Sequence, residues 1–238
     1  MSTRPGFEPI HLRPTAPLAE RVLLPGDPGR ALMLAQLLIS QPKMFNHHRG
    51  LWGYTGPANT DGEPLTVQAT GMGGPSAAIV LHELIQLGVR RAIRVGTCGA
   101  LDPTLALGEL VVASEAIAAD GTSVALGADE RAHPHPELLE RVAAAAPGAR
   151  RGPIASTDVF YEAGSERGER WRRQGAIAVE METAALFTVG VRAGIELACL
   201  LAVSDTFDAY GRRTRIDDDA LLLAAEAMGR SAAIVLTS

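Results

Sequence analysis

The sequence has few cysteines, few aromatic residues and no excess of basic charge. Only two of its 238 residues are cysteine, and aromatic residues make up 4% of the chain. Two cysteines cannot form a disulfide framework and suit a reducing cytosol, which predicts a cytoplasmic location. Sparse aromatics and a formal net charge of -5 argue against nucleic acid as a partner, because such surfaces need basic side chains or stacking platforms.

Long apolar runs and recognisable leader or metal motifs are also missing. Glycine, proline or charge interrupts each apolar stretch, so no membrane span is predicted. No apolar core follows residues 1–6, so no secretory signal is predicted. Because no HExxH, CxxC or His/carboxylate cluster is present, we expect no metal site.

What is present is the composition of an ordinary globular protein, with 47% hydrophobic and 21% charged residues. No linker or repeat divides it, and a single domain over residues 1–238 is predicted. Short apolar runs alternate with helical patterns, which is typical of βαβ units around a largely parallel sheet. Strands are predicted at Arg21–Leu24, Leu65–Thr70, Ala92–Val95, Leu110–Ile117, Gly152–Ala155, Ala176–Val179 and Leu197–Val203. Helices are predicted at Ala31–Ile39, Ser76–Leu87, Pro136–Ala146, Glu182–Ala193 and Asp218–Leu236.

A turn at residues 59–63 separates two strand-like pieces, Gly50–Tyr54 and Leu65–Thr70. This pattern predicts a hairpin, which gives the sheet some antiparallel character. We therefore predict a mixed, partly closed sheet with helices around it.

The unusual residues of the sequence follow the predicted strands. Ligands of open α/β folds bind beyond the carboxyl ends of strands, so these segments predict one shared crevice. The segments are Pro25–Arg30, Gly71–Ser76, Gly96–Gly99, Glu180–Glu182 and Ser204–Asp205.

Each segment has a structural and a functional interpretation. Pro25–Arg30 is either a tight turn that caps a helix or an anion site built from Gly26, Arg30 and helix-end amides. The glycine-rich Gly71–Ser76 favours a structural role, with Ser76 as a possible N-cap.

Three charged residues point more directly to chemistry. Arg94 lies inside an apolar strand and needs either a protein carboxylate or a bound anion, and the glycine and threonine that follow favour the anion. Glu182 is either a helix-dipole partner or an acceptor for a vicinal diol. Asp205 either caps a turn or serves as an acid/base group.

Taken together, these motifs resemble the hexameric, bacterial type of purine nucleoside phosphorylase, whose superfamily includes uridine phosphorylase. The resemblance covers nearly the whole chain and rests on the order and spacing of a set of landmarks. The landmarks are Leu24–Arg30, Arg49 ahead of Gly53–Gly56, Gly71–Ser76, Arg94–Ala100, Phe160-Tyr161, Val179–Glu182 and Ser204-Asp205.

The resemblance implies an α/β fold, a single-domain three-layer sandwich around a mixed, partly barrel-like central sheet. It implies reversible phosphorolysis of purine (deoxy)ribonucleosides to a free base and (deoxy)ribose 1-phosphate, with phosphate as co-substrate and no cofactor. It also implies a homohexamer, a trimer of dimers, in which His11 and Arg49 complete the neighbour's site.

The resemblance further implies a role for each site residue. Positions that match phosphate ligands are Gly26, Arg30, Arg49, Arg94 and Thr97. Positions that match ribose contacts are His11, Met72, Met181 and Glu182. Positions that match base contacts are Cys98, Gly99, Phe160, Val179 and Asp205, and Asp205 also matches the candidate general acid.

Several alternatives stay open at this point. The short segment at residues 162–175 favours purine over uridine, because uridine-specific relatives carry a longer insertion there. A nucleosidase is disfavoured because a water nucleophile needs no arginine cradle, and a non-catalytic nucleoside-binding protein is disfavoured because the set of site residues is intact. The family's arginine that assists the aspartate falls at Asp218, leaving Arg212, Arg213 or Arg215 as substitutes. The choice between 6-oxo and 6-amino purines, the tolerance of deoxyribose and the physiological direction are not decided by the sequence.

Overall fold

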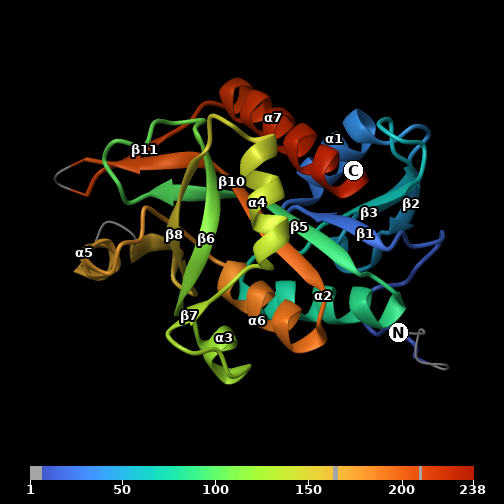
Figure 1. The fold of residues 1–238 in the computed structure, drawn as a ribbon, viewed down its shortest axis with the longest axis horizontal. Helices are drawn as coiled ribbons and strands as arrows, with labels where there is room; N and C mark the ends of the chain where they lie inside the picture. The colour runs from blue at the N-terminus through green and yellow to red at the C-terminus, as the bar shows by residue number, and fades with distance from the viewer. Residues whose placement is uncertain (1–6, 163–165, 209–210) are drawn as a thin grey trace.

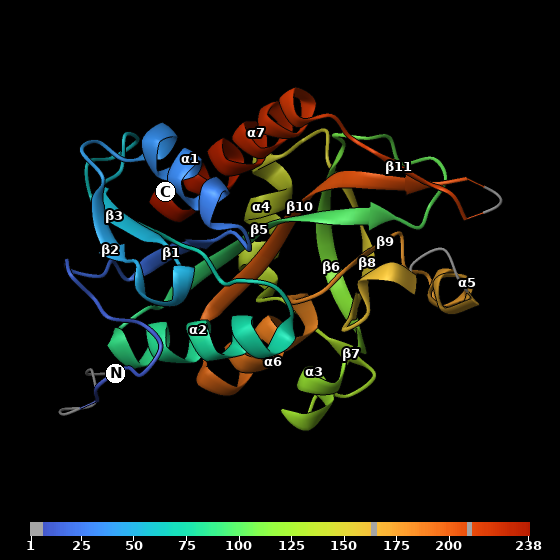
Figure 2. The ribbon, with the colours of Figure 1, turned by 180° about the vertical axis from the view of Figure 1, so that it is seen from behind.

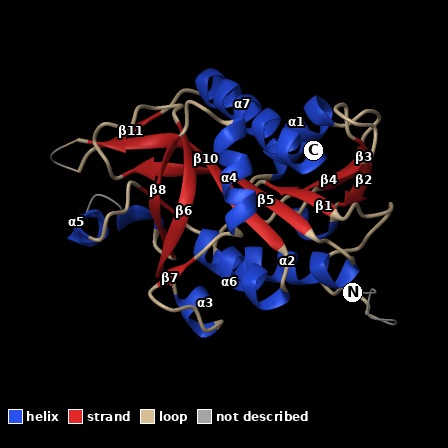
Figure 3. Ribbon diagram, viewed as in Figure 1, coloured by secondary structure: helices blue, strands red, loops and turns tan. Residues whose placement is uncertain are grey.

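The structure is a computed structural model that describes residues 7–162, 166–208 and 211–238. Helices surround a central sheet (Figure 3). The strands are β1 (Arg21–Leu24), β2 (Lys43–Asn46), β3 (Gly53–Pro57), β4 (Pro64–Gln68), β5 (Arg91–Ala100), β6 (Leu110–Ala119), β7 (Arg131–Ala132), β8 (Arg150–Thr157), β9 (Ala178–Glu180), β10 (Glu196–Phe207) and β11 (Arg213–Arg215). The helices are α1 (Pro28–Leu38), α2 (Gly74–Leu87), α3 (Gly121–Ala125), α4 (Pro136–Ala145), α5 (Glu166–Arg173), α6 (Thr183–Ala193) and α7 (Asp218–Thr237), with 3-10 turns η1 (His48–Gly50) and η2 (Phe160–Glu162).

Every described strand belongs to one mixed sheet, part of which closes into a barrel. The strands β10, β6, β8, β9 and β5 are neighbours in that order, and β5 pairs back onto β10 to close the ring. From β5 the sheet continues through β1, β4, β3 and β2, while β11 pairs with β10. The predicted mixed, partly closed sheet is confirmed, as is the hairpin, because β3 and β4 pair antiparallel.

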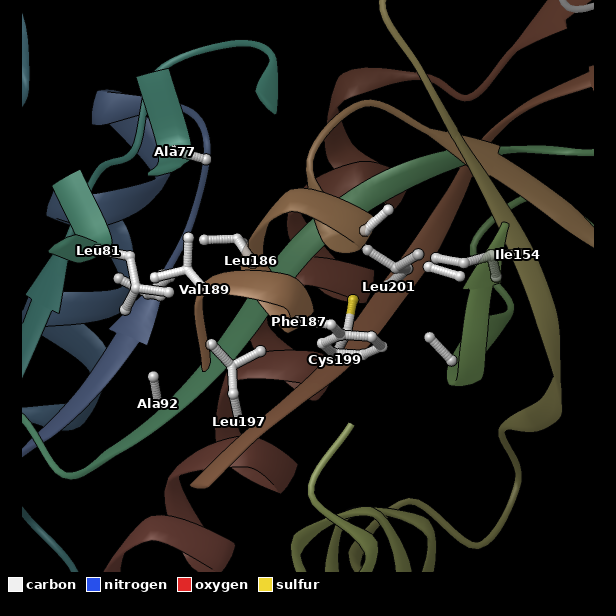
Figure 4. Packing of buried hydrophobic residues seen from close by; sticks show 14 of the residues in the cluster. Ala77, Leu81, Ala92, Ile154, Leu186, Phe187, Val189, Leu197, Cys199 and Leu201 are labelled. Carbon is white, nitrogen blue, oxygen red and sulfur yellow. The ribbon is translucent and has the colours of Figure 1, made fainter. Parts of the chain in front are cut away.

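Helices cover both faces of the sheet, which confirms the three-layer arrangement. The helices α1, α4 and α7 lie on one face, and α2, α3 and α6 lie on the other (Figures 1 and 2). Buried side chains of α2 and α6, such as Leu81, Leu186 and Phe187, form one core with side chains of the sheet (Figure 4). A second core, which includes Leu34 and Met228, is formed on the opposite face by α1, α4, α7 and the sheet.

The helix α7 corrects one expectation from the sequence. By length and composition alone it is apolar enough to cross a membrane, so the statement that no apolar stretch approaches that length is wrong for this helix. Its buried residues, which include Ala225, Met228 and Ala232, belong to the core beneath α1 and α4. A core helix passes the same test, because burial against the sheet also requires an apolar face.

The strands β5 and β10 are longer than predicted. Gly96–Gly99 and Ser204–Asp205 lie within these strands and do not follow them, so that part of the prediction is wrong. The reason is mutual pairing: the two parallel strands stay in contact up to Asp205 and Gly99, and each supplies hydrogen-bond partners for the other. The short elements β2, β7, β11, α3 and α5 were not predicted, because they are too short or too polar to give a periodic pattern.

The end of α6 provides a test of backbone strain. Gly194 terminates the helix with φ 66° and ψ 35°, and a Cβ there would meet no atom within 4 Å. We expect Gly194→Ala to lower the free energy of unfolding by about 1 kcal/mol, because a side chain disfavours left-handed backbone. Urea unfolding measures this change. The control is Gly148→Ala, because a Cβ at Gly148 would also meet no atom within 4 Å and the φ of Gly148 is not positive. An equal loss of unfolding free energy in the control would contradict the explanation.

Candidate functional site

Two loops that follow neighbouring strands are joined by main-chain hydrogen bonds. The amide of Gly71 donates to the carbonyl of Gly26 at 3.0 Å, and the amide of Thr70 donates to that of Pro25 at 2.8 Å. A Cβ at Gly26 would lie 3.2 Å from the Gly71 oxygen, so this close approach depends on glycine. The segments Pro25–Arg30 and Gly71–Ser76, two of the five predicted to share a crevice, therefore lie side by side.

The first loop caps α1 and places Arg30 in its first turn. Asp27 is the N-cap, and its carboxylate accepts a hydrogen bond from the Arg30 amide at 2.7 Å, which confirms the capping interpretation. Burial lowers the pKa of Arg30, and the positive charges of Arg94 and Arg215 act in the same direction against the opposing effect of Asp27. The guanidinium groups of Arg94 and Arg215 therefore lie near enough to Arg30 for their charges to affect it.

Ser76 does not cap the helix that follows the second loop. The N-cap of α2 is Gly73, and the Ser76 hydroxyl donates to the Thr70 carbonyl at 2.6 Å. The capping prediction is wrong because α2 begins earlier, with a proline in its first turn. The hydroxyl instead closes the glycine-rich loop on itself.

Arg94 is buried in β5 and lies against two carboxylates. Its Nε donates to Glu180 Oε2 at 2.9 Å, and its Nη2 donates to Glu182 Oε2. Burial alone would lower the pKa of Arg94, but Glu182 and Glu180 together raise it. The structure thus supplies protein carboxylates, the partner that the sequence favoured less. Within the described residues, the buried Arg94 Nη1 has no hydrogen-bond partner and is left for a further acceptor.

Glu180 is the last residue of β9, and the sequence predicted no role for it. Its carboxylate accepts a hydrogen bond from the Ser156 hydroxyl, and further bonds from the amides of Glu182 at 2.9 Å and Thr183 at 2.9 and 3.0 Å. These donors satisfy a buried charge and fix the start of α6. Glu180 therefore helps to hold Arg94 in place. The sequence feature that could have indicated this role is its position two residues before Glu182.

Glu182 links the glycine-rich loop to Arg94. It is the N-cap of α6, but its Oε1 accepts from the Gly73 amide at 2.5 Å, while its Oε2 receives Arg94. Burial raises the pKa of Glu182, against the opposing effect of Arg94. The Glu182 side chain is buried. Of the two methionines predicted nearby, Met181 is half-buried and Met72 is 88% exposed.

Asp205 lies within β10, so the turn-cap interpretation is wrong. Its Oδ2 accepts from the Ser204 hydroxyl at 2.7 Å, while its buried Oδ1 has no hydrogen bond among the described residues. Strand β11 places Arg215 directly opposite Asp205, and Arg215 Nη1 lies 3.6 Å and Arg213 Nε 3.9 Å from that oxygen. Arg212 instead bonds Asp208 at 2.6 Å. The arginines beside the aspartate are thus Arg213 and Arg215.

The predicted base contacts gather around the same end of β5. Val179 pairs with Gly99, and the buried Cys98 thiol lies 3.7 Å from the Ala202 carbonyl, to which it donates. Burial raises the pKa of Cys98 well above its ordinary value, which fits a lining group and not a nucleophile. Thr97, a predicted phosphate ligand, is half-buried beside Cys98.

Phe160 reaches this region through Arg213. The Arg213 guanidinium lies 4.3 Å from the Phe160 ring centroid, and its Nη2 donates to the Phe160 carbonyl at 3.1 Å. This stacking joins η2 to the β10–β11 hairpin. The candidate acid and the aromatic wall are therefore connected by one side chain.

His11 and Arg49 lie apart from the Arg94 cluster. Neither makes a hydrogen bond or an ion pair with Arg94, Glu180 or Glu182 in the described structure. His11 is bonded to Glu83 of α2, and Arg49 is exposed on η1. The sequence prediction that they act in a neighbour's site is consistent with this separation, which a single chain does not test.

A cavity of about 790 Å³ lies further along the strands, between the 101–107 loop, α5 and the β10–β11 hairpin. None of the predicted site residues lines it, although its lining residue Phe207 also lies against Gly99. The charged groups converge instead at Arg94, Glu180 and Glu182, which we call the arginine cluster.

Comparisons with known proteins agree with this geometry. The family model described as "Phosphorylase superfamily" matches residues 20–238. The DeoD-type purine nucleoside phosphorylase of Caldanaerobacter subterraneus subsp. tengcongensis is 38% identical over 200 residues, covering 79% of this chain and 84% of the relative. That of Alkaliphilus metalliredigens is 37% identical over 205 residues, covering 83% and 87%.

A solved structure, the uridine phosphorylase of Vibrio fischeri ES114, superposes with a TM-score of 0.81 and 26% identity over 92% of each chain. Sequence and structure thus agree over almost the whole molecule. The chain belongs to the phosphorylase superfamily.

Proposed function

We propose that the protein is a purine nucleoside phosphorylase, a pentosyltransferase that moves ribose or deoxyribose reversibly between a purine and phosphate. The observation that carries this proposal is the setting of Arg94. Its guanidinium is buried between Glu180 and Glu182, its Nη1 has no partner among the described residues, and its charge acts on that of Arg30. A water nucleophile would need no such cradle, whereas phosphate does.

Phosphate is held by the main chain at Gly26 and by the side chains of Arg30, Arg94 and Thr97. Arg49 of the neighbouring subunit completes this set. Guanidinium groups match the oxygen atoms of phosphate and neutralise its charge, so the anion can be placed beneath C1′ of the sugar. The unpartnered Nη1 of Arg94 supplies a donor that requires no rearrangement of the two carboxylates.

The ribose lies between the phosphate and the base. Glu182 accepts hydrogen bonds from the vicinal hydroxyls, and Met181 and Met72 pack against the sugar. The neighbour's His11 binds the 5′-hydroxyl. In the described structure Glu182 already bonds Arg94 and Gly73, which fixes its orientation before a nucleoside binds.

The base departs with help from Asp205, in a pocket lined by Cys98, Gly99, Phe160 and Val179. In the forward direction a phosphate oxygen forms a bond to C1′, the C1′–N9 bond breaks, and the bonding electrons go to the purine. Asp205 donates its proton to N7, and the phosphate dianion stabilises the oxocarbenium-like transition state.

The arginines of β11 add a function to this step. Arg215 and Arg213 lie 3.6 and 3.9 Å from Asp205 Oδ1, so they stabilise the carboxylate that remains after proton transfer. Every charge in this scheme is supplied by the chain or by phosphate. We therefore propose that the reaction uses neither a metal nor an organic cofactor.

Purine is favoured over uracil as the base, because relatives at 37% and 38% identity are named purine nucleoside phosphorylases, against 26% identity to the uridine phosphorylase structure. A homohexamer, built as a trimer of dimers, and a cytoplasmic location also belong to the proposal. Both cysteines are unpaired thiols, which supports a reducing compartment.

The reaction class is tested with inosine, guanosine, adenosine and uridine, each assayed with and without phosphate. We expect cleavage of the purine nucleosides only when phosphate is present, with ribose 1-phosphate as a product. Chromatography of base and sugar measures both. Equal rates without phosphate would make the protein a nucleosidase, preference for uridine would make it a uridine phosphorylase, and tight binding without turnover would make it a binding protein.

The acid role of Asp205 predicts a difference between two substrates. We expect Asp205→Asn to lower kcat for inosine by about a hundredfold or more, because the variant cannot protonate N7. 7-Methylguanosine already carries a cationic base and should lose much less. Steady-state kinetics on both substrates measures the difference. Asp208→Asn, on the same hairpin, is the control, and equal losses of Asp205→Asn on both substrates would exclude the role.

The shared site predicts complementation between two inactive variants. We expect Arg49→Ala and Asp205→Asn to be weak alone, and co-expression to restore part of the activity, because one kind of mixed site contains both native residues. Activity assays on the purified mixed oligomer, with its mass from light scattering, measure this. A fully active monomer, or mixed oligomers without recovery, would show that Arg49 does not act across an interface.

A further inference from the structure

One carboxylate holds the segment of chain that carries His11. Glu83 lies in α2 and is 5% exposed. It accepts hydrogen bonds from three consecutive amides, those of Ile10 at 3.0 Å, His11 at 3.0 and 3.1 Å, and Leu12 at 2.7 Å. Among the described residues, no arginine or lysine pairs with Glu83, and these amides with His11 satisfy its charge.

The same carboxylate also fixes the imidazole of His11. Glu83 Oε1 lies 2.8 Å from His11 Nδ1. Burial alone would raise the pKa of Glu83, but the hydrogen bonds from His11, Leu12 and Ile10 outweigh burial and lower it. Both oxygens of Glu83 accept hydrogen bonds from main-chain amides, so Glu83 is also the acceptor toward the ring and Nδ1 carries the hydrogen. In the neutral ring the other nitrogen, Nε2, then has a free lone pair.

This tautomer matters for the 5′-hydroxyl of a nucleoside. A hydroxyl that donates its hydrogen needs an acceptor, which Nε2 provides only while Nδ1 keeps its proton. Without Glu83 the ring could turn, or take the other tautomer, and Nε2 would compete as a donor. The amides of Ile10 and Leu12 would also lose their acceptor, so the position of the arm would loosen.

We infer that Glu83 is the positioning residue of His11, and that it makes the neighbouring subunit's site select nucleosides with a free 5′-hydroxyl. The inference rests on the proposed function. Glu83 does not touch the substrate and acts through the orientation and tautomer of the imidazole. Selectivity against 5′-deoxy substrates is thus set by a residue on α2, outside the arginine cluster.

The test compares inosine with 5′-deoxyinosine in the presence of phosphate. We expect Glu83→Gln to lower kcat/KM for inosine about tenfold, the scale of one charge-assisted hydrogen bond. The value for 5′-deoxyinosine should stay within about twofold, because that substrate has no group for His11 to bind. A residue that is merely structural would affect both substrates equally, and an equal loss would overturn the inference.

A double-mutant cycle separates positioning from independent contributions. We expect His11→Ala to show the same selective loss, and Glu83→Gln to add no further loss on inosine in the His11→Ala background. Additive losses would overturn the inference. Glu140→Gln is the control, since it removes an exposed helix carboxylate that pairs with Arg151 and should change neither substrate.

A conservative variant keeps the test decisive where Glu83→Gln does not fold. Glu83→Asp keeps the acceptor charge with shorter reach, and we expect it to retain the native oligomer mass and an intermediate preference for inosine. No selective loss in folded Glu83→Asp and His11→Ala would overturn the inference. If the native protein cleaves inosine and 5′-deoxyinosine equally well with phosphate, this inference fails while the phosphorylase proposal stands, whereas phosphate-independent cleavage would remove the phosphorylase proposal.

Discussion

The buried ion pair network of Arg94 with Glu180 and Glu182 is the interaction on which the site depends. An unpaired guanidinium in the middle of β5 would cost far more than one hydrogen bond returns, so the carboxylates must stay in place. Because Glu180 ends β9 and Glu182 begins α6, the network ties two strands to a helix. Through the Gly73 amide it also positions the glycine-rich loop. The geometry required for folding is thus the geometry proposed for binding.

The barrel closure explains why the acid lies near this network. Parallel pairing of β5 and β10 carries both strands past the residues expected to end them and brings Asp205 level with Gly99. The bulge between Val203 and Asp205 shifts the register at that point, as bulges near functional sites commonly do. Antiparallel β11 then supplies Arg215 in register with the aspartate. Strand pairing therefore places Asp205 between β5, which carries Arg94, and β11, which carries Arg215.

The sequence predicted most regular elements, because their apolar periodicity is strong. The bounds of β1 agree with the prediction, and the five predicted helices are present. What it could not predict depends on register: neither the pairing of Arg215 with Asp205 nor the place of Glu180 beside Arg94 is visible in local pattern. The sequence did indicate that Arg94 needs an anionic partner, but a protein carboxylate and a bound anion both meet that need. Only three-dimensional contacts distinguish them.

The backbone at Arg49 bears on the proposal that the site is shared between two chains. Arg49 has φ 58° and ψ 20°, a left-handed conformation that costs a residue with a side chain about 1 kcal/mol or more. Within the described residues no hydrogen bond or ion pair involves the Arg49 side chain, which is exposed. Main-chain hydrogen bonds from Gly50 to His47 and from Leu51 to His48 hold this turn, which leaves the Arg49 side chain exposed. Two separate features, the left-handed turn at Arg49 and the arm fixed by Glu83, thus hold the two residues that the proposed oligomer would bring to a neighbour's site.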